Sequence, residues 1–247
     1  MSHRRQAVSA LIIGFSLAGT PVALAEVTAK ETQLAKKFWG ISIGQLEYRY
    51  SDSDAKLGVF EGAAFYGTDE LKGVWLFEGE WENEHSAWET LENQFVAQKP
   101  IAEFFDAKAG IRIDTPEGSD RVFGVLGVTG LAPQWIELDS NLFFSDEGDV
   151  SADLELEYEL LLTNRLIMHA SFEVDVAFSE DKEIGIGSGL NATETGLRLS
   201  YDVIDRLFSP YIGIVHERKY GDTADLAETS EGGTEDWFAV AGVKILF

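Results

Sequence analysis

The chain of 247 residues contains no cysteine and few basic residues, with 19 Lys and Arg against 43 Asp and Glu. No disulfide framework is therefore available, and the 45% of hydrophobic residues must hold the fold together. The formal net charge of −24 argues against a nucleic-acid partner, because such partners are bound through Lys and Arg.

Long apolar runs are also scarce. The first 25 residues hold two arginines, the apolar run AVSALIIGFSLAG and the small-residue pattern ALA, which together predict a secretory signal peptide over residues 1–25. A transmembrane helix is the alternative, but the run is short for a bilayer and a cleavage pattern follows it. No later segment approaches about 18 uninterrupted apolar residues. The remaining choices are a soluble periplasmic β protein and an outer-membrane β-barrel.

Period-2 alternation of apolar and polar residues dominates the rest of the chain, as expected for half-buried strands. The segment VTAKETQLAKKF is the only one marked as a possible short helix, and residues 26–38 are assigned to a short periplasmic leader. The alternation predicts a single β domain over residues 39–247. Its twelve expected strands lie near residues 40–50, 56–66, 72–82, 87–98, 103–114, 121–131, 135–145, 150–162, 165–178, 194–204, 209–219 and 236–247.

The breaks between these strands alternate between two kinds. Acidic, Gly- and Ser-rich breaks such as SDSDA, TPEGSD and SDEGD alternate with compact ones such as GLAPQ and TNR. Outer-membrane barrels have short periplasmic turns and longer external loops, and an even strand number places both termini on one side. The pattern predicts an all-β fold, an antiparallel transmembrane β-barrel of about twelve strands with both termini periplasmic. A soluble sandwich has no reason to sort its loops in this way.

The faces on which the side chains lie also favour a membrane barrel. In the segment from Asp153 to Val176, acids lie on one face of each expected strand and Leu, Tyr, Phe and Val lie on the other. Other strands repeat a polar face of acids with a few bases, as the lumen of a barrel requires. The last strand carries its apolar residues on one face and ends on an aromatic residue, Phe247, as many outer-membrane barrels do.

One expected hairpin places like charges opposite each other. If Thr163 to Arg165 form a three-residue loop, Glu159 lies opposite His169 and Glu155 lies opposite Glu173. Opposed acids cost an amount comparable to the ~0.2–1 kcal/mol of a favourable pair, so a positive charge is expected nearby. It is either a Lys or Arg of a neighbouring strand or a bound or passing cation. The candidate metal ligands are His169, Glu159, Glu157, Glu155, Glu173 and Asp175.

Several blocks of the sequence resemble a known family. The segment FDAKAGIRID, the pattern LGVxGLAPxWxExD, the block YGDTAD and the closing VAGVKILF are similar to the copper resistance protein B family of outer-membrane proteins. The resemblance implies an outer-membrane barrel of a Gram-negative bacterium that handles copper ions beside a periplasmic multicopper oxidase. Its expected partners are outer-membrane lipid and copper ions, and we expect a monomer.

Members of this family often carry a Met- and His-rich segment before the barrel. Here the leader EVTAKETQLAKK has neither residue, and Met168 faces the expected lipid side, so a Met cluster for copper is not predicted. A structural or general cation-selective barrel is one alternative. An outer-membrane lipid hydrolase is another, but His169 and Ser171 lie side by side about 7 Å apart and no G-x-S-x-G elbow occurs, so an enzyme is not predicted.

Overall fold

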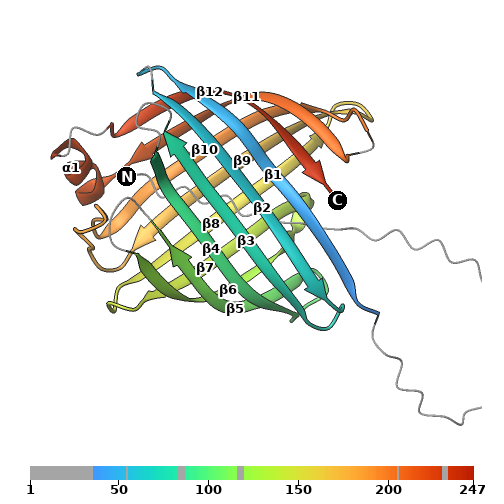
Figure 1. Cartoon of the computed structure of the whole chain (residues 1–247), viewed down its shortest axis with the longest axis horizontal. Helices are drawn as coiled ribbons and strands as arrows, with labels where there is room; N and C mark the ends of the chain where they lie inside the picture. The colour runs from blue at the N-terminus through green and yellow to red at the C-terminus, as the bar shows by residue number, and fades with distance from the viewer. Residues whose placement is uncertain (1–35, 54, 83–86, 116–119, 205, 230–232) are drawn as a thin grey trace, which may run out of the picture.

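A computed structural model describes residues 36–247 apart from residues 54, 83–86, 116–119, 205 and 230–232. The described residues form a closed barrel of twelve antiparallel strands (Figure 1). The strands are β1 (Phe38–Ser51), β2 (Lys56–Gly67), β3 (Lys72–Glu82), β4 (Ala87–Pro100), β5 (Phe105–Asp114), β6 (Arg121–Ala132), β7 (Ile136–Ser145), β8 (Val150–Leu161), β9 (Leu166–Ala177), β10 (Gly189–Tyr201), β11 (Phe208–Lys219) and β12 (Glu235–Leu246). The expected signal peptide and residues 26–35 of the expected leader lie outside the described residues.

The barrel closes between its first and last strands. Each strand pairs with its neighbour in the chain, and β1 pairs with β12 through contacts such as Ser42 opposite Leu246. Closure leaves no sheet edge with unpaired backbone groups, which is what allows a sheet to stand in hydrocarbon. Within the described residues, no helix is long and apolar enough to cross a membrane.

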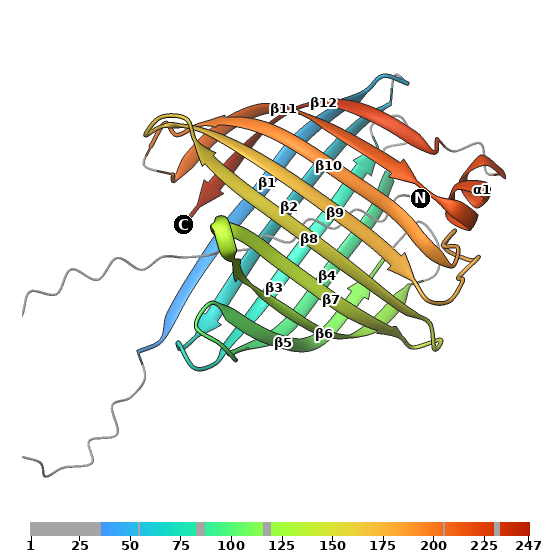
Figure 2. The same ribbon diagram turned by 180° about the vertical axis from the view of Figure 1, so that it is seen from behind.

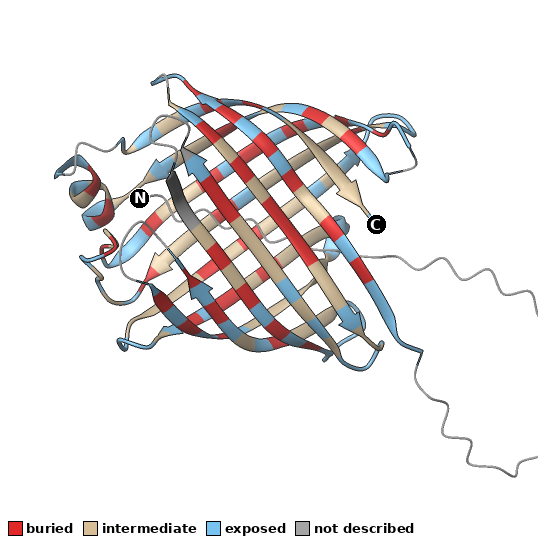
Figure 3. Ribbon diagram, viewed as in Figure 1, coloured by how far each residue is buried: buried red, intermediate tan, exposed pale blue. Residues whose placement is uncertain are grey.

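The outer wall is apolar and the lumen holds the buried charged residues, as the alternation predicts. Two small apolar clusters also face the lumen, one of Leu57, Val215, Phe238 and Val240 and one of Val96, Phe123, Val125 and Phe143. On β9, Phe172 is 40% exposed on the outer wall, whereas Glu173 beside it is only 3% exposed. Figure 3 shows this alternation as buried and exposed bands along the strands. Large apolar side chains such as Leu126 and Ile212 are more than half exposed at 52% and 65%, so the outer wall suits lipid and not water.

The loops sort to the two ends of the barrel. The compact turns lie at the end where β1 begins and β12 ends, and one of them contains the short 3-10 helix η1 (Pro133–Trp135). The longer acidic loops lie at the opposite end with the helix α1 (Gly221–Thr229), as Figure 2 shows. That the compact-turn end faces the periplasm stays a prediction.

Two local expectations differ from the structure. Strand β10 begins at Gly189 and ends at Tyr201, earlier than the expected residues 194–204, because the Gly-rich segment that was read as loop pairs with β9 across a bulge. Helix α1 was expected to be loop. Its Thr223 hydroxyl accepts a hydrogen bond of 2.9 Å from the Gly187 backbone N–H, and a Cβ on Gly187 would lie 2.4 Å from Asp222 Cβ. The helix is therefore held by tertiary contact, which local sequence does not reveal.

Candidate cation site in the barrel lumen

Acidic residues line up across neighbouring strands in the lumen. One line, the first acidic row, crosses six strands from β7 to β12, and each member lies directly opposite the next. It consists of Asp139, Glu155, Glu173, Glu194, Glu217 and Asp236. Asp139 lies near the compact turn of β7, whereas Asp236 lies beside the acidic loop of β12. Because strands tilt against the barrel axis, the row climbs along most of the lumen.

A second acidic row crosses the opposite part of the wall, from β2 to β5. It consists of Glu61, Glu78, Glu92 and Asp114. Within the two rows, most carboxylates are buried, for example Glu61 at 4% and Glu155 at 5% exposure. Directly opposed acids are destabilising, and buried charges require compensation, so the rows need positive charge in the lumen.

Two arginines supply part of that charge on the side of β10, β11, β12 and β1. Arg49, at 1% exposure, donates to Glu47 at 2.6 Å, to Glu217 at 2.9 Å and to Glu194 at 3.1 Å. Arg198 donates to Glu47 from the other side at 2.8 Å. We call these five residues the arginine plug. Its guanidinium groups bring the carboxylates of three strands together and fill that side of the lumen with side chains.

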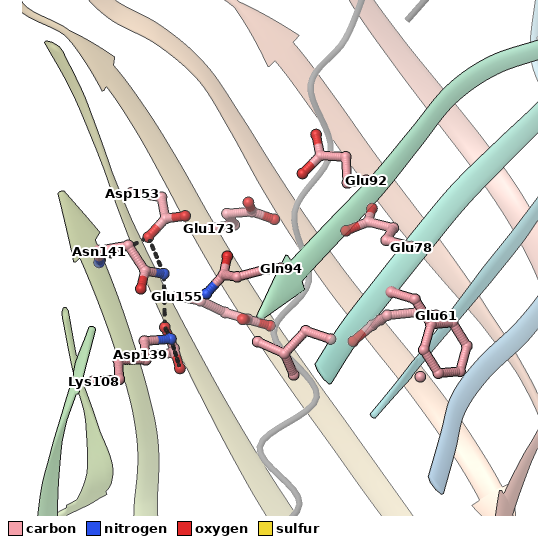
Figure 4. A pocket seen from close by; sticks show the side chains of 13 residues that line it. Glu61, Glu78, Glu92, Gln94, Lys108, Asp139, Asn141, Asp153, Glu155 and Glu173 are labelled. Atoms are coloured by element: carbon pink, nitrogen blue, oxygen red, sulfur yellow. Dashed lines mark hydrogen bonds and ion pairs between the residues drawn. The ribbon is translucent and has the colours of Figure 1, made fainter. Parts of the chain in front are cut away.

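A cavity lies between the two acidic rows on the other side of the lumen. The volume open to the centres of water molecules is about 50 Å³, enough for more than one water, since about 10–15 Å³ of such volume holds one. Figure 4 shows Glu61, Glu78 and Glu92 on one wall and Asp139 and Asp153 on the other. The polar lining is Glu61, Glu78, Glu92, Gln94, Lys108, Asp139, Asn141, Asp153, Glu155 and Glu173.

The cavity lining is rich in oxygen atoms that can act as ligands for a cation. Carboxylate and amide oxygens suit hard and borderline divalent cations, and Lys108 is the only base among the described residues that line the cavity. Arg112 approaches from outside the lining and donates to Glu92 at 2.9 Å and to Asp114. Seven acids against one lysine and one arginine leave more carboxyl groups than bases at the cavity, and a bound cation would stabilise their ionised form.

The predicted hairpin register is confirmed, and it divides the six candidate ligands. Glu155 lies opposite Glu173 and Glu159 lies opposite His169, as expected. Glu155 and Glu173 line the cavity, but Glu157, Glu159, His169 and Asp175 are not part of the lining. Along the barrel axis, Asp175 lies toward the acidic-loop end of β9 and the Glu159–His169 pair lies toward the compact-turn end.

Most of the cavity was missed by sequence reasoning. Glu61, Glu78, Glu92, Asp139 and Asp153 were not among the candidate ligands. The alternation places each of them on a lumen face, which is the only signal that the sequence offers for them. Their meeting at one cavity depends on closure of the barrel, which brings β2 to β4 opposite β7 to β9.

His169 is engaged by other groups. Its Nε2 atom lies 2.9 Å from Ser200 Oγ, and its Nδ1 atom lies 3.3 Å from a Glu159 oxygen and 3.4 Å from Lys244 Nζ. A lysine ammonium can only donate and a carboxylate can only accept, so Nδ1 accepts from Lys244 in one ring tautomer and donates to Glu159 in the other. The Ser200 hydroxyl lies 3.3 Å from the Ile167 carbonyl, to which it can donate.

This arrangement has the residue types of a Ser-His-Glu triad, but its serine is buried. A serine nucleophile must reach a substrate as well as give its proton to the histidine. Ser200 is only 1% exposed, so its hydroxyl is closed off from a substrate. Ser171, the serine weighed from sequence, accepts from Arg198 at 3.3 Å instead of contacting His169.

A second group of carboxylates lies at the acidic-loop end. Ligand atoms of Glu147, Asp149 and Asp181 lie within 4.8 Å of one another. Arg121 binds this group, with its guanidinium 3.1 Å from Asp181 and 3.6 Å from Glu147. Arg121 already supplies a positive charge there, so we interpret these carboxylates as ion-pair partners of Arg121 at the barrel rim and not as a metal site.

A closed twelve-stranded barrel with a lipid-compatible outer wall and a charged lumen defines an outer-membrane β-barrel protein, and this chain is one. Two solved porin structures share the fold. The NanC porin matches with a TM-score of 0.55 at 11% identity, over 83% of this chain and 98% of that one. The KdgM porin matches with a TM-score of 0.50 at 10% identity, over 83% of this chain and 99% of that one.

The family is shown by sequence. Residues 37–247 match the family model described as Copper resistance protein B precursor, and the chain belongs to that family. It is 34% identical over 207 residues to the Copper resistance protein B of Escherichia coli, covering 84% of this chain and 69% of that protein. It is 33% identical over 172 residues to the Copper resistance protein B homolog of Pseudomonas syringae pv. tomato, covering 70% of this chain and 58% of that protein. Family membership supports a role in copper tolerance.

Proposed function

We propose that this barrel binds copper ions in its acidic lumen and thereby serves copper tolerance at the outer membrane. The observation that carries the proposal is the meeting of the two acidic rows at one cavity. Seven carboxylates line it, and Lys108 is the only base that the described part of the chain contributes to the lining. Buried carboxylates need counter-charge, and oxygen donors of this kind bind divalent copper more tightly than most first-row divalent ions.

We infer that the arginine plug and the small size of the cavity favour binding over free flow. The arginine plug occupies the side of β10 to β1, and the cavity on the other side has only about 50 Å³ open to water centres. We propose that an ion entering from the acidic-loop end rests in the cavity between Glu155 and Glu173. Passage would then proceed from one carboxylate to the next and not through an open aqueous pore.

The remaining candidate ligands form a line along this proposed route. Asp175 lies on the acidic-loop side of the cavity, and Glu157, Glu159 and His169 lie on its compact-turn side. We propose them as weaker stations for an arriving or departing cation. Lys244 must leave His169 Nδ1 before that nitrogen can bind a metal.

The proposed partners are those that the family resemblance implies. We propose that the barrel acts as a monomer in outer-membrane lipid, beside a periplasmic multicopper oxidase that meets its compact-turn end. We also propose that it is not an enzyme, since the serine of the triad-like group, Ser200, is only 1% exposed and is closed off from a substrate.

Copper binding by the purified barrel in detergent tests the proposal. Wild-type protein should bind Cu(II) by equilibrium dialysis, and the double variant Glu155→Gln, Glu173→Gln should lose at least tenfold in affinity. Asp225→Asn with Glu228→Gln is the matched control, because both are exposed acids on α1 far along the chain from the cavity strands. Equal binding by the double variant and the wild type would contradict the proposed site.

Conductance across planar bilayers separates the alternatives. Stoichiometric Cu(II) binding with little current supports the proposal as stated, and a cation current that is unselective among divalent ions would favour a general cation-selective barrel. No binding and no current would leave a structural barrel. Hydrolysis of lipid by wild-type protein, lost in Ser200→Ala, would favour the hydrolase.

A further inference from the structure

Lys108 lies in the cavity wall and reaches across a neighbouring strand. It belongs to β5, and its partner Asp139 belongs to β7, so β6 lies between them. Opposite Lys108 on β6 is Gly127. A Cβ on Gly127 would lie 2.8 Å from Lys108 Cε and 2.5 Å from Asn141 Oδ1. Only glycine leaves the space for the lysine stem to cross β6.

The lysine ammonium occupies the oxygen atoms of Asp139. Lys108 Nζ lies 2.5 Å and 2.6 Å from the two carboxylate oxygens, and the lysine side chain is 0% exposed. Asn141 donates to Asp139 at 2.8 Å and to Asp153 at 2.8 Å, which ties both carboxylates to the same network. In this state the ammonium neutralises the first carboxylate of the first acidic row.

A buried amide group in the cavity lacks a hydrogen-bond acceptor within the described part of the chain. Gln94 is 9% exposed, lines the cavity, and its Nε2 has no hydrogen-bond acceptor among the described residues. Figure 4 shows Gln94 projecting between the two walls. A buried amide donor costs free energy unless it meets an acceptor, and the oxygen of a water in the cavity or in the hydration shell of an ion supplies one.

A lysine side chain can leave its carboxylate partner more easily than an arginine can. Its ammonium is a point charge on a flexible stem, whereas an arginine such as Arg112 is held in a planar fork by several acceptors. We propose that Lys108 is a tethered counter-cation of the cavity, and that a divalent cation entering the lumen competes with it for Asp139. The inference rests on the proposed function and deepens it, because Lys108 would set the affinity and the charge preference of the same site.

Removal of the tethered charge provides the test. Lys108→Leu is chosen over Lys108→Met because a thioether would add a copper ligand of its own. The variant should bind aqueous Cu(II) and Mg(II) at least tenfold more tightly than wild type by equilibrium dialysis. Its thermal midpoint should fall in chelator and recover when Cu(II) is added. Lys72→Leu is the control for loss of a lysine charge outside the cavity, since Lys72 pairs with Asp106 at 3.0 Å in a more exposed place and does not line the cavity.

A second comparison tests the proposal even if the Lys108→Leu variant fails to fold. Asp139→Asn frees the ammonium inside the cavity, so it should weaken Cu(II) binding. The double variant Lys108→Leu, Asp139→Asn removes both charges and should bind more tightly than Asp139→Asn alone. Equal affinities in these two variants, or unchanged affinity in Lys108→Leu, would overturn the role of Lys108 while leaving copper binding by wild type intact. Absence of Cu(II) binding in every variant and in wild type would overturn the proposed function as well.

Discussion

The arginine plug makes a quantitative prediction about stability. The guanidinium of Arg49 contacts three carboxylates between 2.6 and 3.1 Å, and its side chain is 1% exposed. Replacing it with methionine keeps much of the volume but leaves Glu47, Glu194 and Glu217 without this partner. Removing one partner of a buried charge pair typically costs about 3–5 kcal/mol, because the remaining charge stays buried.

We therefore expect Arg49→Met to lower the free energy of unfolding by about 3 kcal/mol or more. Arg198 reduces this loss of stability, because it still contacts Glu47 at 2.8 Å. Urea unfolding of the barrel refolded into lipid vesicles, followed by tryptophan fluorescence and gel mobility, measures the change. The unfolding should be measured at low and at moderate salt. Because buried ion pairs are screened less than exposed ones, the effect of Arg49→Met should change little with salt.

Arg218→Met is the matched control. Its side chain is 50% exposed and lies 3.9 Å from Glu235, so its loss should cost less than about 1 kcal/mol. If Arg49→Met costs no more than Arg218→Met, water reaches the plug carboxylates freely. The lumen would then be hydrated along its length, and our account of a filled side beside a cavity would be wrong.

Three further predictions follow from the fold. Gly127→Val should destabilise the barrel by at least about 1 kcal/mol in the same unfolding assay, because its side chain must displace Lys108, whereas Gly124→Val on the same strand, whose nearest contact for a Cβ is 3.9 Å away, should cost less. Leu126→Arg on the outer wall should cost about 2–4 kcal/mol by vesicle refolding if it lies near the bilayer midplane, and a neutral result would refute the lipid-facing assignment. His169→Ala should leave Cu(II) affinity at the cavity within about threefold of wild type by dialysis, and a larger loss would show that His169 is a primary ligand.

The strands of this barrel were predictable because a half-buried strand leaves a local record. Apolar and polar residues alternate with period 2, and Gly, Ser, Asn and Asp gather in the breaks. The register of β8 against β9 was also predictable, since the short loop after Leu162 permits one pairing. The start of β10 and the helix α1 were not, because each depends on contacts with a distant segment.

The candidate site was predictable only in part. Glu155 and Glu173 could be placed opposite each other from one hairpin, and both line the cavity. His169 looked like the best nitrogen ligand, but Ser200 and Lys244 come from β10 and β12, and no local pattern indicates that they meet its ring. A side chain's facing is encoded locally, whereas its partners across a lumen are not.

By itself, the sequence determined the facing of each residue, lipid or lumen, and hence the membrane character and the acidity of the interior. Pairing of successive strands then followed from short connections. Only the closed tertiary structure decided that Glu61 and Glu78 face Glu155 across a cavity, and that Lys108 crosses Gly127 to reach Asp139. The physical reason is curvature: the distance between non-neighbouring strands is set by how the whole sheet bends and closes, which no single strand specifies.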